Sequence, residues 1–279
     1  MWSTREQQLI LKTQVNSENA PISSVCFSSL EEYTFFASSG TIVSQFDIRN
    51  VITPTRVMNE NLDDINQITI DEKGKYLAAC DDSGTIKVID LERGKIFKTL
   101  SRIHTNACNS VQFRPRRPYE LFSGGFDKLM VHWDFTRAKV IQKINATAST
   151  EDGPSMLYNP PYVYSLAVSP DGSYVASGLG DSTIGMYRFT ERGNAITEAS
   201  LQNAHSLVVS QVVFMSSETL ISGGNDCKIC IWQLPDEKKT KPQLRHVLKH
   251  VGKINWLSTA GRKLFVADIS NTITEYNIE

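Results

Sequence analysis

The chain has 279 residues, of which 41% are hydrophobic and 21% charged, so it can bury a core and is not of the disordered class. Its 29 Lys and Arg nearly balance its 30 Asp and Glu; this excludes a general binder of nucleic acid or anionic membranes, which needs a surplus of positive charge. No apolar run reaches the roughly 18–20 residues of a membrane-spanning helix. The five cysteines lie mostly in strand-like runs, which favours reduced thiols and an intracellular location, cytoplasmic or nuclear.

A pattern repeats about every 44 residues along the chain. Each copy ends in a segment such as LFSGGFDKLMVHW or LISGGNDCKICIW, whose last residue we call the slot. The separations between successive slots are 43, 44, 54, 45 and 44 residues. A period of this length is typical of a repeat architecture. The six slots are Phe46, Ile89, Trp133, Tyr187, Trp232 and Tyr276.

Each copy contains alternating apolar runs separated by Gly, Asp and Ser, which predicts short antiparallel strands. In the copy that ends at Trp133 we expect strands over residues 110–113, 120–124 and 130–134, and a fourth over 140–144. Four short strands per unit describe the blades of a β-propeller, because each blade must be covered by its neighbours. The sequence predicts an all-β fold, with residues 1–279 forming one propeller domain.

The beginning of the chain leaves two arrangements open. Trp2 lies 44 residues before Phe46 and makes a seventh slot, so the prediction is six complete four-stranded blades plus the remnant of a seventh. In one reading the parent has seven blades and the first is cut short. In the other, residues 6–15 pair with the last strand, over residues 271–278, and close a ring of six blades.

The repeats resemble those of the WD-repeat family, which is named for a Trp-Asp dipeptide. That dipeptide occurs in this sequence at Trp133–Asp134. The resemblance implies a buried polar network of His, Ser, Asp and Trp that ties a loop to a turn and has a structural role. In the last repeat His250 has its place, but Ser270 stands where Asp is expected. The two full copies are His104, Ser123, Asp127 and Trp133, and His205, Ser222, Asp226 and Trp232.

No pattern in the sequence indicates catalysis. Cys227 and Cys230 form a lone CxxC without the second pair that a zinc site needs. There is no phosphate-binding glycine loop and no GxSxG turn. We therefore expect a protein that is not an enzyme and has no metal and no cofactor.

The segment Phe46-Asp47-Ile48-Arg49 resembles the WDxR box of propellers that act as substrate receptors of Cullin-4 RING ubiquitin ligases. The resemblance implies that Asp47 and Arg49 contact the ligase adaptor. It departs from the family at Phe46, which replaces Trp. The alternative is that Arg49 is an ordinary charge at the end of a strand. Trp133-Asp134-Phe135-Thr136-Arg137 is a second candidate, in which the Arg comes one residue late.

The loop RPRRP, residues 114–118, joins a first strand to a second and so emerges on the same face as segments that follow third strands. We expect a basic patch there that favours an acidic protein surface; the alternative is a rigid solvated loop. The leading hypothesis is a ubiquitin ligase substrate receptor, and the alternative is a scaffold in an unrelated intracellular complex. The expected partner-binding residues are Asp47, Arg49, Arg114, Arg116, Arg117 and Arg137.

Overall fold

The computed structural model describes residues 2–3, 8–9, 20–146, 159–189, 195–235 and 241–278. Every element named in these ranges is a β-strand, which confirms the all-β prediction. The strands are β1 (Trp2–Ser3), β2 (Gln8–Leu9), β3 (Ile22–Phe27), β4 (Thr34–Ser39), β5 (Ile42–Asp47), β6 (Arg56–Met58), β7 (Ile65–Ile70), β8 (Tyr76–Asp81), β9 (Ile86–Asp90), β10 (Lys95–Leu100), β11 (Cys108–Phe113), β12 (Glu120–Gly125), β13 (Leu129–Asp134), β14 (Lys139–Asn145), β15 (Val163–Val168), β16 (Tyr174–Leu179), β17 (Ile184–Phe189), β18 (Ala195–Leu201), β19 (Val209–Ser216), β20 (Thr219–Gly224), β21 (Lys228–Gln233), β22 (Gln243–Lys249), β23 (Ile254–Ala260), β24 (Lys263–Asp268) and β25 (Ile273–Asn277).

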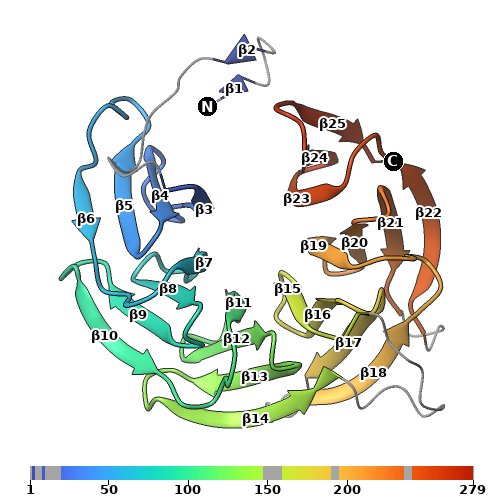
Figure 1. Ribbon diagram of the computed structural model, residues 1–279, viewed down its shortest axis with the longest axis horizontal. Coiled ribbons are helices and arrows are strands. Elements are labelled where there is room, and N and C mark those ends of the chain that lie inside the picture. The colour runs from blue at the N-terminus through green and yellow to red at the C-terminus, as the bar shows by residue number, and fades with distance from the viewer. Residues whose placement is uncertain are drawn as a thin grey trace.

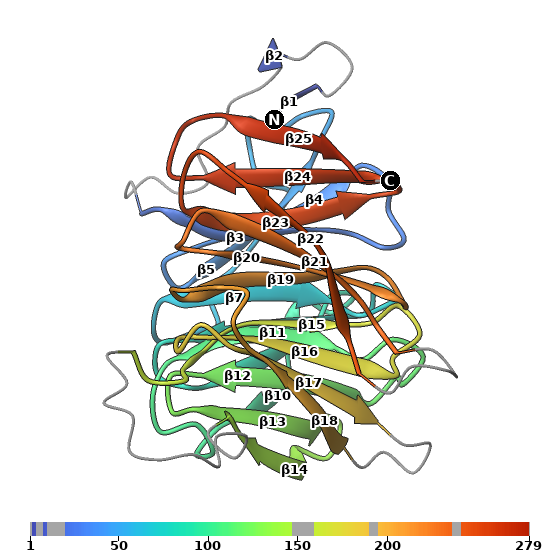
Figure 2. The same ribbon diagram turned by 90° about the vertical axis from the view of Figure 1, so that its right-hand side faces the viewer.

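Consecutive strands form the blades of a six-bladed β-propeller (Figure 1). The first five sheets have four antiparallel strands each, beginning with β3–β6 and ending with β19–β22. The sixth sheet has three strands, β23, β24 and β25, among the described residues. The first strand of each sheet lies nearest the central axis, and in the four-stranded sheets the fourth strand forms the rim (Figure 1). Figure 2 shows the sheets on one side of the propeller stacked one above another.

The first strand of every blade carries the same irregularity. In β11 the pairing with β12 shifts between Cys108 and Ser110, and the other five first strands shift at the same place. A bulge bends a strand and increases its twist. Both effects fit the position of the first strands next to the central axis of the propeller. The repeat seen in the sequence therefore extends to the register of the strands.

The core lies between neighbouring sheets rather than within any one of them. Trp133 and Phe135 of the third blade pack in one buried cluster with Ile86 and Val88 of the second. Full burial of a side chain of this size contributes about 1.5–3 kcal/mol. Each blade is therefore stabilised by its neighbours, as expected for a repeat protein.

The N-terminal segment forms a ribbon of its own. Trp2 pairs with Leu9 and Ser3 with Gln8, so β1 and β2 are antiparallel partners. In the alternative ring closure, residues 6–15 would pair with the last strand; the described part of that segment, Gln8–Leu9, pairs with β1 instead. Residues 10–19, 147–158 and 236–240 lie outside the described residues.

Candidate partner-binding face

The predicted polar network of the third blade is present and buried. Nε2 of His104 lies 2.8 Å from Oγ of Ser123, which also accepts a 2.8 Å hydrogen bond from Nε1 of Trp133. Nδ1 of the same ring lies 3.0 Å from the carboxylate of Asp127, in the turn between β12 and β13. The network ties the loop before the first strand to that turn, so its geometry fits the structural role that we expected.

The fifth blade repeats this arrangement residue by residue. His205 lies 2.9 Å from Oγ of Ser222 and 3.0 Å from Asp226, and Trp232 donates to Ser222 at 3.0 Å. Burial opposes ionisation of Asp226, but the hydrogen bond from His205 and the backbone N–H of Ser206 outweigh it and lower the pKa of the carboxyl. Burial also lowers the pKa of His205, against the opposite pull of Asp226.

In two other blades, a bond to an aspartate again ties down the loop before the first strand, but different residues make it. In the second blade Asn61 takes the place of the histidine and donates to Asp81 at 2.8 Å. In the sixth, Nε2 of His250 lies 3.0 Å from Asp268, while Oη of Tyr276 is 2.8 Å from Nδ1. The aspartate of this blade is therefore Asp268, two residues before Ser270, the position at which the repeat pattern predicts it.

Asp47 and Arg49 form a bidentate ion pair at the end of the third strand of the first blade. Nε and Nη2 of Arg49 donate to the two carboxylate oxygens of Asp47 at 2.9 and 2.5 Å. The guanidinium also lies over the ring of Tyr33, 4.5 Å from its centroid. Hydrogen bonding to Arg49 lowers the pKa of Asp47 to about 2. Arg49 is exposed and Asp47 partly buried, and the two contacts orient the guanidinium at the surface.

The next two blades carry a related pair in the same turn. Nη1 of Arg93 lies 3.8 Å from Asp90, and Nε of Arg137 lies 3.7 Å from Asp134. Both arginine side chains are largely exposed. We call the face that carries Arg49, Arg93 and Arg137 the arginine face. Sequence reasoning missed Arg93, although it follows the slot residue Ile89 by four positions, as Arg137 follows Trp133.

The loop 114–118 emerges on the arginine face, as its position between two strands predicted. The N–H of Phe135, after the third strand, donates to the carbonyl of Tyr119 at 3.0 Å, which joins the two segments. The first blade has the equivalent bond from Ile48 to Tyr33 at 2.7 Å. Arg137 and the loop therefore lie at the same end of the third blade.

Arg114 differs from the other arginines of this loop because it is buried, with a side chain only 4% exposed. Its guanidinium donates to Glu120 at 2.7 Å and to the carbonyl of Gly172 at 2.9 Å, and lies over the ring of Phe189. Gly172 and Phe189 belong to the fourth blade. Arg114 therefore connects the third blade to the fourth and does not present its charge to a partner.

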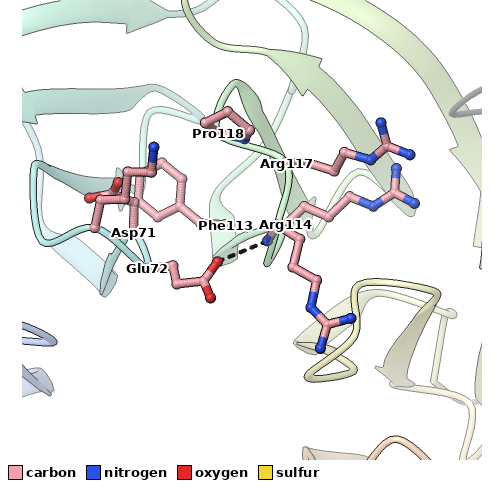
Figure 3. Close-up of a pocket in the computed structure, with 8 residues that line it drawn as sticks. Asp71, Glu72, Phe113, Arg114, Arg117 and Pro118 are labelled. Carbon is pink, nitrogen blue, oxygen red and sulfur yellow. Dashed lines mark hydrogen bonds between the residues drawn. The ribbon is translucent and has the colours of Figure 1, made fainter.

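Arg116 and Arg117 are exposed and border a small pocket between the second and third blades (Figure 3). The carboxylate of Glu72 accepts the backbone N–H of Arg116 at 2.9 Å, which fixes the loop from the second blade. Arg116 has a φ of 61°, in the left-handed region. The pocket has a volume of about 150 Å³ and is lined by Asp71, Glu72, Lys73, Phe113, Arg114, Arg116, Arg117 and Pro118.

The sheets, the central axis and the His–Ser–Trp networks define a WD-type propeller. The family model of the WD domain, G-beta repeat, matches residues 52–90, 94–134, 156–188 and 198–233, and the chain belongs to the WD-repeat family. Proteins of this family are generally non-enzymatic scaffolds that bind protein partners. Among the described residues, no group of three or more His, Cys, Asp or Glu side chains is arranged to hold a metal ion, and no helix has the length and apolarity to cross a bilayer.

Three curated relatives show how far the similarity extends. The WD repeat-containing protein 53 homolog of Dictyostelium discoideum is 30% identical over all of this chain and 85% of its own length. Protein SLOW WALKER 1 of Arabidopsis thaliana is 26% identical over 76% of this chain and 37% of its own. The small ribosomal subunit protein RACK1 of Neurospora crassa is 25% identical over 65% of this chain and 55% of its own.

Proposed function

We propose that this protein is a substrate receptor of a Cullin-4 RING ubiquitin ligase and docks on the ligase adaptor through its arginine face. Asp47 and Arg49 make the central contact, and the opposite face of the propeller is left for the substrate. The proposal carries with it an intracellular location, cytoplasmic or nuclear.

The observation that supports this proposal most is the geometry of Arg49. A long, flexible side chain loses entropy when a partner immobilises it, but Arg49 is already oriented by Asp47 and Tyr33. A planar guanidinium with several donors is also a common anchor of protein interfaces. The resemblance of residues 46–49 to the WDxR box supplies the identity of the partner.

The exposed arginines of the neighbouring blades extend the contact. Arg93, Arg116, Arg117 and Arg137 lie on the same face, and their charges favour an acidic surface on the adaptor. Arg114 is not part of this proposal because its charge is paired inside the protein. Phe46 is fully buried and stacks on Phe35 with 5.2 Å between ring centroids, so it supports the turn as the tryptophan of the WDxR box would.

The second candidate is a scaffold in an unrelated intracellular complex. It is favoured by the relatives, because one of them is named as a protein of the small ribosomal subunit. In this case the same arginine face binds an acidic protein that is not a ligase subunit. Proximity labelling that recovers neither the Cullin nor the adaptor supports this second candidate.

The direct test is recovery of the ligase adaptor from cells that express the wild type, Arg49→Ala or Arg245→Ala. Arg245 is an exposed arginine on the outer strand β22 and serves as the matched control. We expect the first variant to lose most of the adaptor, since interface anchors cost about 2 kcal/mol or more when truncated. Equal recovery by all three folded proteins contradicts the proposal.

A further inference from the structure

Four blades place an equivalent pair of residues next to the central axis, on the face opposite the arginine face. One residue directly precedes the first strand and the other directly follows the second strand, and the N–H of the second residue donates to the carbonyl of the first at 2.9–3.0 Å. First strands lie nearest the axis (Figure 1) and end at the arginine face, so these pairs surround the axis at the other face. We call them the inner ring. The pairs are Asp64 and Asp82, Ala107 and Phe126, Tyr162 and Gly180, and Val208 and Asn225.

Three aromatic side chains meet on the inner ring between the third and fourth blades. The centroid of the Phe126 ring lies 5.5 Å from that of Tyr162 and 5.0 Å from that of Tyr164, the second residue of β15. All three side chains are partly exposed, and neither tyrosine hydroxyl has a hydrogen-bond partner among the described residues. This aromatic cluster therefore presents ring surface and two free hydroxyls to solvent.

The aromatic cluster departs from the pattern of the repeat. In the other five blades the second residue of the first strand is small and polar, as Asn66 is, which donates to the carbonyl of Cys108 in the next blade at 3.2 Å. The ring of Tyr164 instead packs on Phe126 of the preceding blade, and Gly180 leaves room for it, since a Cβ there would lie 3.3 Å from its Cε2. The joining of blades does not require a tyrosine here. The residues at this place in the other blades are Ser23, Asn66, Asn109, Ser210 and Asn255.

The second blade places carboxylates beside the aromatic cluster. Three exposed aspartates lie there without an ion-pair partner among the described residues: Asp63, Asp64 and Asp82. Asn66 donates to Asp82 at 2.8 Å and to the carbonyl of Cys108, the first residue of β11. On the other side of the same backbone, the residue before Cys108 accepts the N–H of Phe126. The carboxylates and the aromatic cluster therefore flank the start of β11.

The cations of this face lie elsewhere. Arg102 follows the outer strand β10, and Lys128 directly precedes the third strand β13, so both lie farther from the axis than the inner ring. Lys253 directly precedes β23 of the sixth blade, on the other side of the axis (Figure 1). Among the described residues, the inner ring of the second, third and fourth blades thus carries negative charge and no positive charge.

Arginine is the side chain that best matches a carboxylate next to an aromatic ring. A guanidinium pairs with a carboxylate through its edge and stacks on a ring through its face. This chain contains that arrangement twice: Arg49 pairs with Asp47 and lies 4.5 Å over the ring of Tyr33, and Arg114 does the same with a glutamate and a phenylalanine.

We propose that the inner ring of the second to fourth blades binds an arginine-containing segment of a substrate protein. The guanidinium pairs with Asp64 and Asp82 and stacks on the ring of Phe126. A large apolar residue two or three positions away packs on Tyr162 and Tyr164, because one extended residue spans only about 3.3–3.6 Å. The inference rests on the proposed function only in calling this partner a substrate.

The test begins with the selection of random heptapeptides, displayed on phage, on the immobilised full chain. We expect the enriched peptides to carry an arginine with an aromatic or other large apolar residue two or three positions away. The most enriched peptide is then synthesised and titrated beside a copy with citrulline in place of the arginine. Citrulline keeps the shape and loses the charge, so this copy should bind about tenfold more weakly. Selection without enrichment of arginine, or equal binding of the two peptides, overturns the proposal.

Variants of the full chain locate the site. The double variant Asp64→Asn, Asp82→Asn removes two charges and keeps an acceptor oxygen at each place, and Tyr164→Asn restores the kind of side chain that the repeat uses there, so both should fold. Each should weaken peptide binding by about tenfold. Two controls at the arginine face, Glu92→Gln at an exposed acid of the second blade and Tyr119→Asn at a tyrosine that is 60% exposed, should leave it unchanged. Equal binding by variants and controls overturns the proposal.

Failure of this inference is distinguishable from failure of the proposed function. Peptide binding is measured with the chain alone, whereas recovery of the adaptor depends on Arg49 at the other face. A chain that recovers the adaptor but selects no arginine peptide overturns this inference alone. A chain that binds the peptide but recovers no adaptor contradicts only the role in the ligase.

Discussion

The guanidinium of Arg114 donates a 2.9 Å hydrogen bond to the carbonyl of Gly172, 58 residues further along the chain, and so joins the third blade to the fourth. The same guanidinium pairs with Glu120, whose carboxylate also lies 2.8 Å from Nε2 of the buried His132. Burial opposes ionisation of Glu120, but its bonds to His132 and Arg114 outweigh it and lower the pKa of the carboxyl. An arginine that the sequence places in a surface loop is thus the centre of a buried contact between blades.

Arg114→Met should strongly destabilise the protein. It keeps most of the side chain's volume but leaves Glu120 without its cation, and breaking a buried ion pair on one side costs about 3–5 kcal/mol. Urea unfolding at pH 7 measures the loss. Arg137→Met, at the largely exposed arginine of the same blade, should change the free energy of unfolding by less than about 1 kcal/mol. Similar losses in both variants contradict the role of Arg114.

Ser123→Ala should lower the free energy of unfolding by about 1–3 kcal/mol, because it removes the shared partner of His104 and Trp133. Ser44 gives the matched control: it is equally buried, but its Oγ has no hydrogen-bond partner. Ser44→Ala should leave stability unchanged or raise it slightly, since the variant no longer buries an unpaired hydroxyl. Thermal unfolding of the two variants side by side distinguishes them.

The stability of the protein should fall as the pH drops below about 6.5. The pKa of His205 is lowered by burial from its ordinary value of 6.5, so between the two values the unfolded chain holds a proton that the folded chain does not. The contribution is complete above pH 6.5 and decreases as the pH falls toward the folded pKa. Below about pH 3.8, protonation of Asp226, whose pKa is also lowered, removes a further part.

His205→Asn isolates this effect. Asn61, which takes the place of the histidine in the second blade, donates at 2.8 Å to an aspartate at the end of the second strand, Asp81. The variant should keep the fold and show a flatter dependence of unfolding free energy on pH just below about pH 6.5, the ordinary pKa of histidine. An unchanged slope means that another group dominates in this range.

Arg49→Ala should return the pKa of Asp47 from about 2 toward its ordinary value of 3.8, since hydrogen bonding to Arg49 is the largest cause of the shift. Because Arg49 is exposed and the pair lies at the surface, the variant should unfold at nearly the same urea concentration as the wild type. Titration of the Asp47 carboxyl by NMR checks the first statement. If the pKa stays near 2, the pair does not orient Arg49 in solution.

Most of the architecture was predictable because each blade of a propeller repeats the same short-range pattern of strands and polar residues. The slot spacing gave the blades, and the fixed offsets of Ser123 and Asp127 from Trp133 gave the network that the structure contains. The offset is shifted in the sixth blade, where Asp268 replaces the expected residue. The sequence does not distinguish which aspartate near a polar turn will bond the histidine, because that depends on the geometry of the turn.

The sequence by itself determined the class of fold, the strand order within each blade and the loops that share a face, because these follow from short-range alternation and from a period that local sequence carries. Only the tertiary structure decided that Arg114 is buried while Arg116 and Arg117 are exposed. Burial at these positions depends on which neighbouring sheet lies against them, and that neighbour comes from a distant part of the chain.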